Sequence, residues 1–179
     1  FVGDTLEVHA PEYDPLVHLV DPEGAPRLVE IWGDHVTAAD QGDAAAAWFS
    51  TVMERSCRLV AFGSAASRPV DPTYSPCADA ETAFTDGYPL LGVLQESLDD
   101  LNARLPGPVP MARFRPSLVF SGAPAWSEDD WTELTVGDLV LDAVKPCARC
   151  VVTTRDQVTG ATDPNQEPLR TLATFRTVQ

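Results

Sequence analysis

The sequence lacks several features that would place the chain in a common class at once. Its 179 residues contain no run of about eighteen apolar residues, so no membrane-spanning helix is expected. Glycine-rich phosphate loops and a Gly-x-Ser-x-Gly motif are absent, which argues against a nucleotide-binding domain or an α/β-hydrolase. The chain starts at Phe1 with neither an initiator methionine nor a signal-peptide pattern, so we expect part of a longer protein.

Positive charge is scarce. Twelve Lys and Arg residues stand against twenty-seven Asp and Glu residues, which gives a formal net charge of −15. Phosphate backbones and anionic headgroups repel a chain this acidic, so no nucleic acid and no membrane is expected as a partner. Apolar residues make up 44% of the chain, a share that favours a folded domain over a disordered tail.

Cysteine is also sparse. The four cysteines are Cys57, Cys77, Cys147 and Cys150. Secreted disulfide scaffolds are usually denser in cysteine, so we expect a reduced, cytoplasmic protein. Cys57 is expected in the core and Cys77 in a loop. No chemical role is assigned to either of them.

Two helices are predicted. The alanine run after Gly42-Asp43 has the best helix composition in the chain and predicts a helix over residues 43–55. Ser97 followed by Asp100 has the form of a capping box, and leucines at helical spacing predict a helix over residues 97–105.

Strands are predicted more widely, because sixteen prolines and short apolar runs suit strands joined by tight turns. Residues 64–83 are small, polar and proline-containing, which predicts a linker or loop. A hairpin is predicted around Gly137-Asp138. The predicted fold is therefore mainly β with short helices (α+β). Further strands are predicted at residues 28–32, 57–62, 89–94 and 114–120.

Cys147-Ala148-Arg149-Cys150 is the most distinctive motif, because two thiols three residues apart can converge on one point. A redox dithiol, half of a zinc site, and a single thiolate ligand to a soft, oxo-rich metal centre all stay open. A thioredoxin-like dithiol opens a helix, whereas the β-branched run 151–154 follows here. The purely structural interpretation is two small buried residues at the end of a strand.

The surroundings of this motif are unusually cationic. The only lysine of the chain, Lys145, and four arginines lie between residues 113 and 155. Cations lower the pKa of a nearby thiol and attract an anionic ligand. Ordinary ion pairs with the abundant carboxylates are the alternative explanation. The four arginines are Arg113, Arg115, Arg149 and Arg155.

A series of motifs, taken in order, resembles the MOSC domain family, in the branch of YcbX-type proteins and the mitochondrial amidoxime reducing component. The resemblance implies the latter part of the family's N-terminal β-barrel-like domain at residues 1–63. It implies a MOSC domain with a MOSC-type β-barrel at residues 84–179, whose C-terminal end is missing. The motifs are Asp86-Gly87-Tyr88-Pro89-Leu90-Leu91, Ser97-Leu98-Asp99-Asp100-Leu101-Asn102, Arg113-Phe114-Arg115-Pro116, Glu128-Asp129-Asp130-Trp131, Gly137-Asp138, residues 145–154 and Glu167-Pro168-Leu169.

The resemblance also implies a molybdenum cofactor, in which the metal is carried by a molybdopterin. The family's metal ligand is the second cysteine of the motif, here Cys150, which would be the catalytic residue. Ala148 stands where relatives often carry serine, and Ser117 stands where the family's Phe-Arg-Pro-Asn motif has asparagine. The cofactor-binding residues implied are Asp86, Gly87, Tyr88, Arg115, Ser117, Ala148 and Arg149.

The function implied for the intact protein is a molybdenum-dependent oxidoreductase that reduces small N-hydroxylated compounds. Its electrons would come from a donor protein, such as a flavin reductase, a ferredoxin or a fused 2Fe–2S domain. One alternative is a carrier or sulfur-transfer domain like that of cofactor sulfurases, in which a pyridoxal-phosphate domain supplies sulfur. Another is a plain β domain with a redox-sensitive Cys147–Cys150 pair and no molybdenum.

Overall fold

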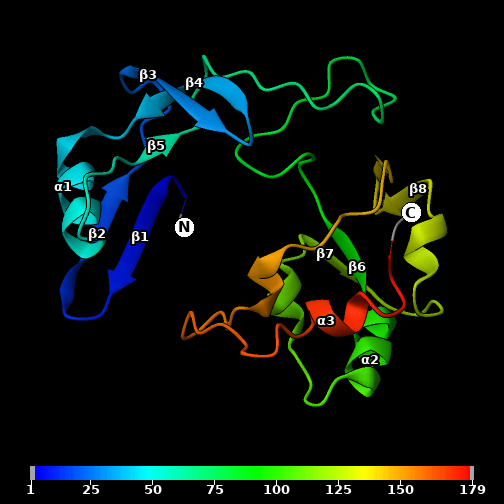
Figure 1. Cartoon of the computed structure of the whole chain (residues 1–179). Helices are drawn as coiled ribbons and strands as arrows, with labels where there is room; N and C mark the ends of the chain where they lie inside the picture. The colour runs from blue at the N-terminus through cyan, green and yellow to red at the C-terminus, as the bar shows by residue number, and fades with distance from the viewer. Residues whose placement is uncertain (1–2, 178–179) are drawn as a thin grey trace. The chain divides into compact units, whose positions relative to one another are not determined.

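A computed structural model of the chain describes residues 3–177, which fall into two compact units (Figure 1). Within the described residues, the first unit comprises residues 3–71 and 77–89, and the second comprises residues 72–76 and 90–177. Small sheets with a few short helices build the chain, which confirms the predicted mainly β, α+β class. The strands of the described residues form four separate sheets. No closed barrel is seen among them, so the expected barrel is not confirmed.

The first unit contains two antiparallel sheets. Strands β1 (Thr5–Ala10) and β2 (Tyr13–Leu19) form a hairpin. In the second sheet, β4 (Asp34–Asp40) lies between β3 (Pro26–Ile31) and β5 (Val60–Ala61). The strand predicted at residues 28–32 corresponds to β3, whereas the one predicted at 57–62 shrinks to the two residues of β5.

Helix α1 (Gly42–Val52) begins two residues after β4 ends, and the alanine run favours it as predicted. Ala45 and Ala46 are buried, and the indole nitrogen of Trp48 donates to the Asp14 carbonyl of β2 at 2.8 Å. The helix stops short of the predicted residue 55, because Glu54 has a φ of 51°, which no right-handed helix accommodates.

The second unit is built from short elements. Strand β6 (Gly92–Leu94) pairs in parallel with β7 (Leu118–Phe120), and helix α2 (Gln95–Arg104) follows β6 directly. Strands β8 (Glu133–Val136) and β9 (Leu139–Asp142) form the predicted hairpin. The remaining elements are the 3₁₀ helices η1 (Met111–Phe114), η2 (Ser127–Asp130) and η3 (Val151–Thr154), and the short helix α3 (Leu169–Leu172).

A single apolar cluster holds η1 in place. Leu98 and Leu101 of α2, Phe114 of η1 and Leu172 of α3 are buried against one another. Burying side chains of this size stabilises a domain by about 1.5–3 kcal/mol each. The cluster therefore fixes the short segment that carries Arg113 and Arg115.

Two local predictions for this unit were wrong in detail. Ser97 does not cap α2, which begins at Gln95. Its hydroxyl is buried and donates to the Glu128 carboxylate at 2.8 Å, while the Trp126 amide donates to it at 2.7 Å. The strand predicted over residues 114–120 is cut to three residues, because Arg115 ends η1 in the left-handed region with a φ of 52°.

Candidate functional site

The Cys147–Cys150 segment lies in an irregular connection between β9 and η3, with both cysteines exposed and neither in a disulfide. The interpretation of this pair as two buried residues at a strand end is therefore wrong. The Cys147 thiol points back to the Ala148 carbonyl, with a sulfur–oxygen distance of 3.6 Å. An exposed thiol in an irregular segment is sterically open to a ligand from outside the chain.

The backbone after Cys150 is held by the turn that follows it. The β-branched run forms the 3₁₀ helix η3, in which Thr153 donates to the Cys150 carbonyl from its amide at 3.2 Å and from its hydroxyl at 3.0 Å. The Thr154 hydroxyl donates to the Val151 carbonyl at 2.7 Å, and both threonines are buried. The exposed Cys150 side chain thus projects from a fixed backbone.

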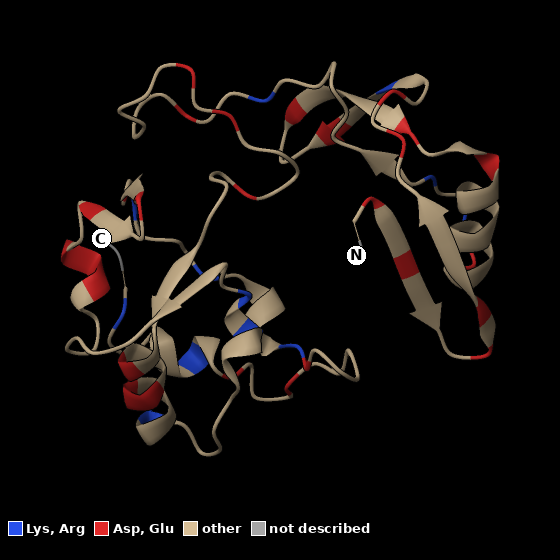
Figure 2. Cartoon of the chain, turned by 180° about the vertical axis from the view of Figure 1, so that it is seen from behind, with Lys and Arg blue, Asp and Glu red and all other residues tan. Residues whose placement is uncertain are grey.

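Helix η1 brings arginines to the same part of the second unit, because it packs against η3. The Arg149 guanidinium carbon lies 5.5 Å from the centre of the Phe114 ring, next in sequence to the exposed Arg115. A guanidinium on an aromatic face is worth about 0.5–1 kcal/mol at exposed sites. Blue Lys and Arg segments are fewer than the red Asp and Glu segments on the ribbon, most of which is tan (Figure 2).

The cationic cluster expected from the sequence is only partly assembled. The Lys145 ammonium lies over the Tyr74 ring, 4.7 Å from its centre. Arg155 donates to the Gly160 carbonyl at 3.3 Å.

The Ser117 hydroxyl accepts a hydrogen bond from the Leu91 amide at 3.2 Å, and the Ser117 amide donates to the Leu91 carbonyl at 2.8 Å. Ser117 therefore ties β7 to the segment before β6.

The other predicted cofactor-binding residues, Asp86, Gly87 and Tyr88, lie in the first unit. Their loop is anchored by Arg68, whose side chain is only 5% exposed. Arg68 Nη1 donates to the carbonyls of Ala83, Thr85 and Asp86 at 2.9, 2.7 and 2.9 Å, and its Nε donates to Asp34 at 2.9 Å.

Sequence reasoning missed Arg68. Nothing in its local sequence marks it, because its partners are mainly backbone carbonyls that only the folded loop brings together. The Tyr88 hydroxyl adds a second tie, donating to the Asp71 carbonyl at 3.3 Å.

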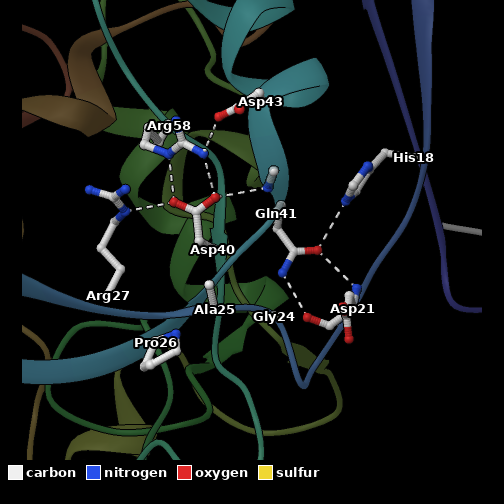
Figure 3. Close-up of a pocket in the computed structure, with 11 residues that line it drawn as sticks. His18, Asp21, Gly24, Ala25, Pro26, Arg27, Asp40, Gln41, Asp43 and Arg58 are labelled. Carbon is white, nitrogen blue, oxygen red and sulfur yellow. Dashed lines mark hydrogen bonds and ion pairs between the residues drawn. The ribbon is translucent and has the colours of Figure 1, made fainter.

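The first unit also contains a cavity of about 500 Å³, and the buried Asp40 is one of the residues that line it (Figure 3). Arg58 donates to both carboxylate oxygens at 2.5 and 2.7 Å, Arg27 at 2.6 Å, and the Gly42 amide at 2.8 Å. The Arg58 hydrogen bonds, with those of Gly42 and Arg27, hold the pKa of the Asp40 carboxyl well below its usual range.

Gln41 completes this network. Its amide oxygen accepts from His18 and the Asp21 amide, and its amide nitrogen donates to the Asp21 carbonyl (Figure 3). The same nitrogen also donates to the Ala39 carbonyl. Every atom of the Gln41 amide is thus partnered within the chain, as are both carboxylate oxygens of Asp40. We interpret the cavity as a structural junction of β2, β3 and β4 with the start of α1 and with Arg58, which precedes β5.

Within residues 3–177, no three or more His, Cys, Asp or Glu side chains are grouped so that they could hold a metal ion. Among the same residues, no helix has the length and apolar character needed to cross a membrane.

Comparison with known proteins gives one family and a consistent set of relatives. The family model described as MOSC domain matches residues 79–179. The chain is 35% identical over 180 residues to mitochondrial amidoxime-reducing component 1 of Mus musculus, covering 97% of the chain and 52% of that protein. The human protein of the same name is 36% identical over 182 residues, with 97% and 53% covered.

A second kind of relative matches a smaller part of this chain. Molybdenum cofactor sulfurase of Oryza sativa subsp. japonica is 34% identical over 164 residues, which are 83% of this chain and 20% of that protein. The chain spans about half the length of the amidoxime-reducing components that it matches.

Proposed function

The chain belongs to the MOSC domain family, and on that basis we propose that it is the molybdenum-cofactor binding part of an oxidoreductase. Its relatives are named for amidoxime reduction and for the molybdenum cofactor, which supports this class of chemistry. The observation that carries the proposal is the exposed Cys150, held by η3 and followed by buried threonines, in the same unit as two solvent-accessible arginines.

The donor set fits such a cofactor. A thiolate is a soft ligand of the kind that suits a molybdenum centre, and Cys150 is exposed and outside any disulfide. The cofactor's phosphate is anionic, and a guanidinium matches phosphate geometry better than an ammonium. Arg149, resting on Phe114, and the exposed Arg115 supply that charge.

The remaining site residues have more limited roles in this proposal. Ala148 has no polar side chain, so it would contact the cofactor through its backbone only. The Ser117 hydroxyl already accepts the Leu91 amide, so its role would be to hold that segment. Asp86, Gly87 and Tyr88 would present a loop whose shape depends on Arg68.

The chemistry supplied by such a cofactor when bound is two-electron removal of oxygen from an N-hydroxylated compound, with release of water. The chain's own residues would bind and orient the cofactor. Cys150 would be the metal ligand, and Arg115 and Arg149 would be the anion-binding groups. We further propose an electron-donor protein as partner and the cytoplasm as location. The flavin reductase, ferredoxin or 2Fe–2S domain expected from the sequence stay alternatives for that donor.

The second candidate is a cofactor carrier or sulfur-transfer domain, favoured by the similarity to a molybdenum cofactor sulfurase. The exposed Cys147 beside Cys150 would suit transfer of sulfur. Pyridoxal phosphate belongs to this alternative alone. A reductase assay separates the two candidates, because a carrier binds molybdenum without reducing an amidoxime when chemically reduced methyl viologen supplies the electrons.

The proposal is tested by molybdenum and pterin analysis of the full-length protein, purified from a host that makes the cofactor. We expect near-stoichiometric molybdenum in the wild type and in Cys147→Ala, the matched control, and its loss in Cys150→Ala. Molybdenum retained in Cys150→Ala at the wild-type level would refute the assignment of the ligand.

A further inference from the structure

Arg113 is a buried guanidinium that the proposed cofactor contacts do not use. It belongs to η1, and only 13% of its side chain is exposed. Phe114, the next residue, is part of the apolar cluster of the second unit. Because η1 packs against η3, Arg113 lies in the part of the fold that also carries Cys150.

Most of its hydrogen-bonding capacity is unused within residues 3–177. Its Nε and Nη1 atoms are buried and have no hydrogen-bond partner there. Nη2 approaches Asp156 Oδ2 at 3.5 Å, the outer limit of a hydrogen bond. Nε carries one N–H and Nη1 carries two, so three donors of a permanently charged group are buried without an acceptor.

The neighbouring carboxylate compensates for only part of this, through one ion pair between Asp156 Oδ2 and Arg113 Nη2. Asp156 Oδ1 accepts from the amides of Val158 and Thr159 at 3.0 and 2.9 Å, and from the Thr159 hydroxyl at 3.0 Å. These bonds, together with the charge of Arg113, lower the pKa of Asp156, so its carboxylate is the charged partner of Arg113. Arg113 Nε and Nη1 still have no acceptor within the described residues.

Buried charged donors are normally matched by an acceptor, since leaving them unmatched is costly. One water molecule can accept about two hydrogen bonds and brings no charge. An oxyanion with several oxygens supplies the acceptors that Nε and Nη1 lack, and its negative charge suits the guanidinium. We therefore infer that Arg113 is a binding residue for an oxyanion of the phosphate class, held through Nε and Nη1. That the anion is a group of the cofactor rests on the proposed function.

The experiment uses the full-length protein made without cofactor. Thermal denaturation is followed in rising inorganic phosphate, with ionic strength held constant by chloride. A ligand that binds only the folded state raises its stability in proportion to the logarithm of its concentration above Kd. We expect phosphate to stabilise the wild type and to bind Arg113→Gln at least about tenfold more weakly, the usual effect of losing charge-assisted hydrogen bonds.

Three further variants sharpen the result. Arg170→Gln removes an exposed arginine of the same unit and should respond like the wild type. Asp156→Asn removes the nearby negative charge and should bind phosphate more tightly. Arg113→Lys keeps the charge without the planar donors, and it should also bind more weakly. It replaces Arg113→Gln if that variant does not fold.

Absence of stabilisation by phosphate in the wild type, or an unchanged response in Arg113→Gln or Arg113→Lys, would overturn the inference. Cys150→Ala without cofactor should keep the phosphate response, so failure of the metal assignment is seen separately. In the holoprotein, loss of the response would assign the anion to the bound cofactor. A persisting response would assign it to a free anion, and either result supports the oxyanion site.

Discussion

Replacing Arg68 by methionine tests whether one buried guanidinium shapes the loop of residues 83–88. The substitution keeps an unbranched side chain but leaves three carbonyls and Asp34 without their donor. Hydrogen bonds to charged groups contribute about 1.5–3 kcal/mol each and are not additive, and water will solvate part of what is exposed. We expect the first unit to lose about 2–4 kcal/mol of stability.

Hydrogen exchange followed by mass spectrometry measures this loss in the first unit alone. The probe is the Thr82 amide, which donates to the Arg68 carbonyl at 3.0 Å and lies beside the anchored loop. A loss of that size accelerates its exchange by roughly tens- to hundreds-fold, since about 1.4 kcal/mol is a factor of ten. In Arg68→Lys, the Thr82 amide should exchange faster than in the wild type and more slowly than in Arg68→Met, because one ammonium cannot reach all four acceptors.

Arg55→Met is the control, because Arg55 is an exposed arginine of the same unit. Its exchange should match that of the wild type within experimental error. Exchange of the Thr82 amide that is equally slow in Arg68→Met and Arg55→Met would show that Arg68 does not anchor the loop.

Three other predictions concern the core, the Asp40 junction and the site. Leu101→Ala should cost about 2–5 kcal/mol in urea denaturation, because Leu101 is 2% exposed within the apolar cluster; a loss below 1 kcal/mol would contradict that packing. The pKa of Asp40 in the folded state lies below its unfolded value of about 3.9. The ionised carboxylate therefore stabilises the fold fully above that pH, and this stabilisation declines as the pH falls further. Asp40→Asn should therefore reduce the loss of stability at acidic pH, and an unchanged loss would refute this. A double-mutant cycle of Phe114→Leu and Arg149→Gln should give a coupling energy of about 0.5–1 kcal/mol, and strict additivity would show that Arg149 does not rest on the ring.

The sequence predicted best the elements that depend on local composition. The alanine run became α1, and the turn at Gly137-Asp138 became the β8–β9 hairpin, because helix propensity and turn geometry act over a few residues. Ser97 shows the limit. The local sequence around Ser97 resembles a helix cap, but its hydroxyl donates to the Glu128 carboxylate and accepts from the Trp126 amide, both about thirty residues away.

The residues that shape the candidate site depend on distant partners. Arg68 anchors its loop through carbonyls more than ten residues away in the sequence. Arg113 is buried because η1 packs against η3. No pattern in the sequence encodes either contact, because both follow from how irregular segments pack. The motif at Cys147–Cys150 was visible from the sequence, whereas the exposure of both thiols and the turn that holds Cys150 required the structure.

We propose that the sulfur of Cys150 is a ligand to molybdenum. X-ray absorption at the molybdenum edge reports the sulfur neighbours of the metal, and we would measure it on the full-length holoprotein with Cys150→Ser and Cys147→Ser as the paired variants. Serine offers oxygen in place of sulfur, so metal that remains bound to Cys150→Ser should lose one sulfur neighbour, while Cys147→Ser keeps the wild-type shell. An unchanged number of sulfur neighbours in Cys150→Ser would refute the assignment of Cys150 as the ligand.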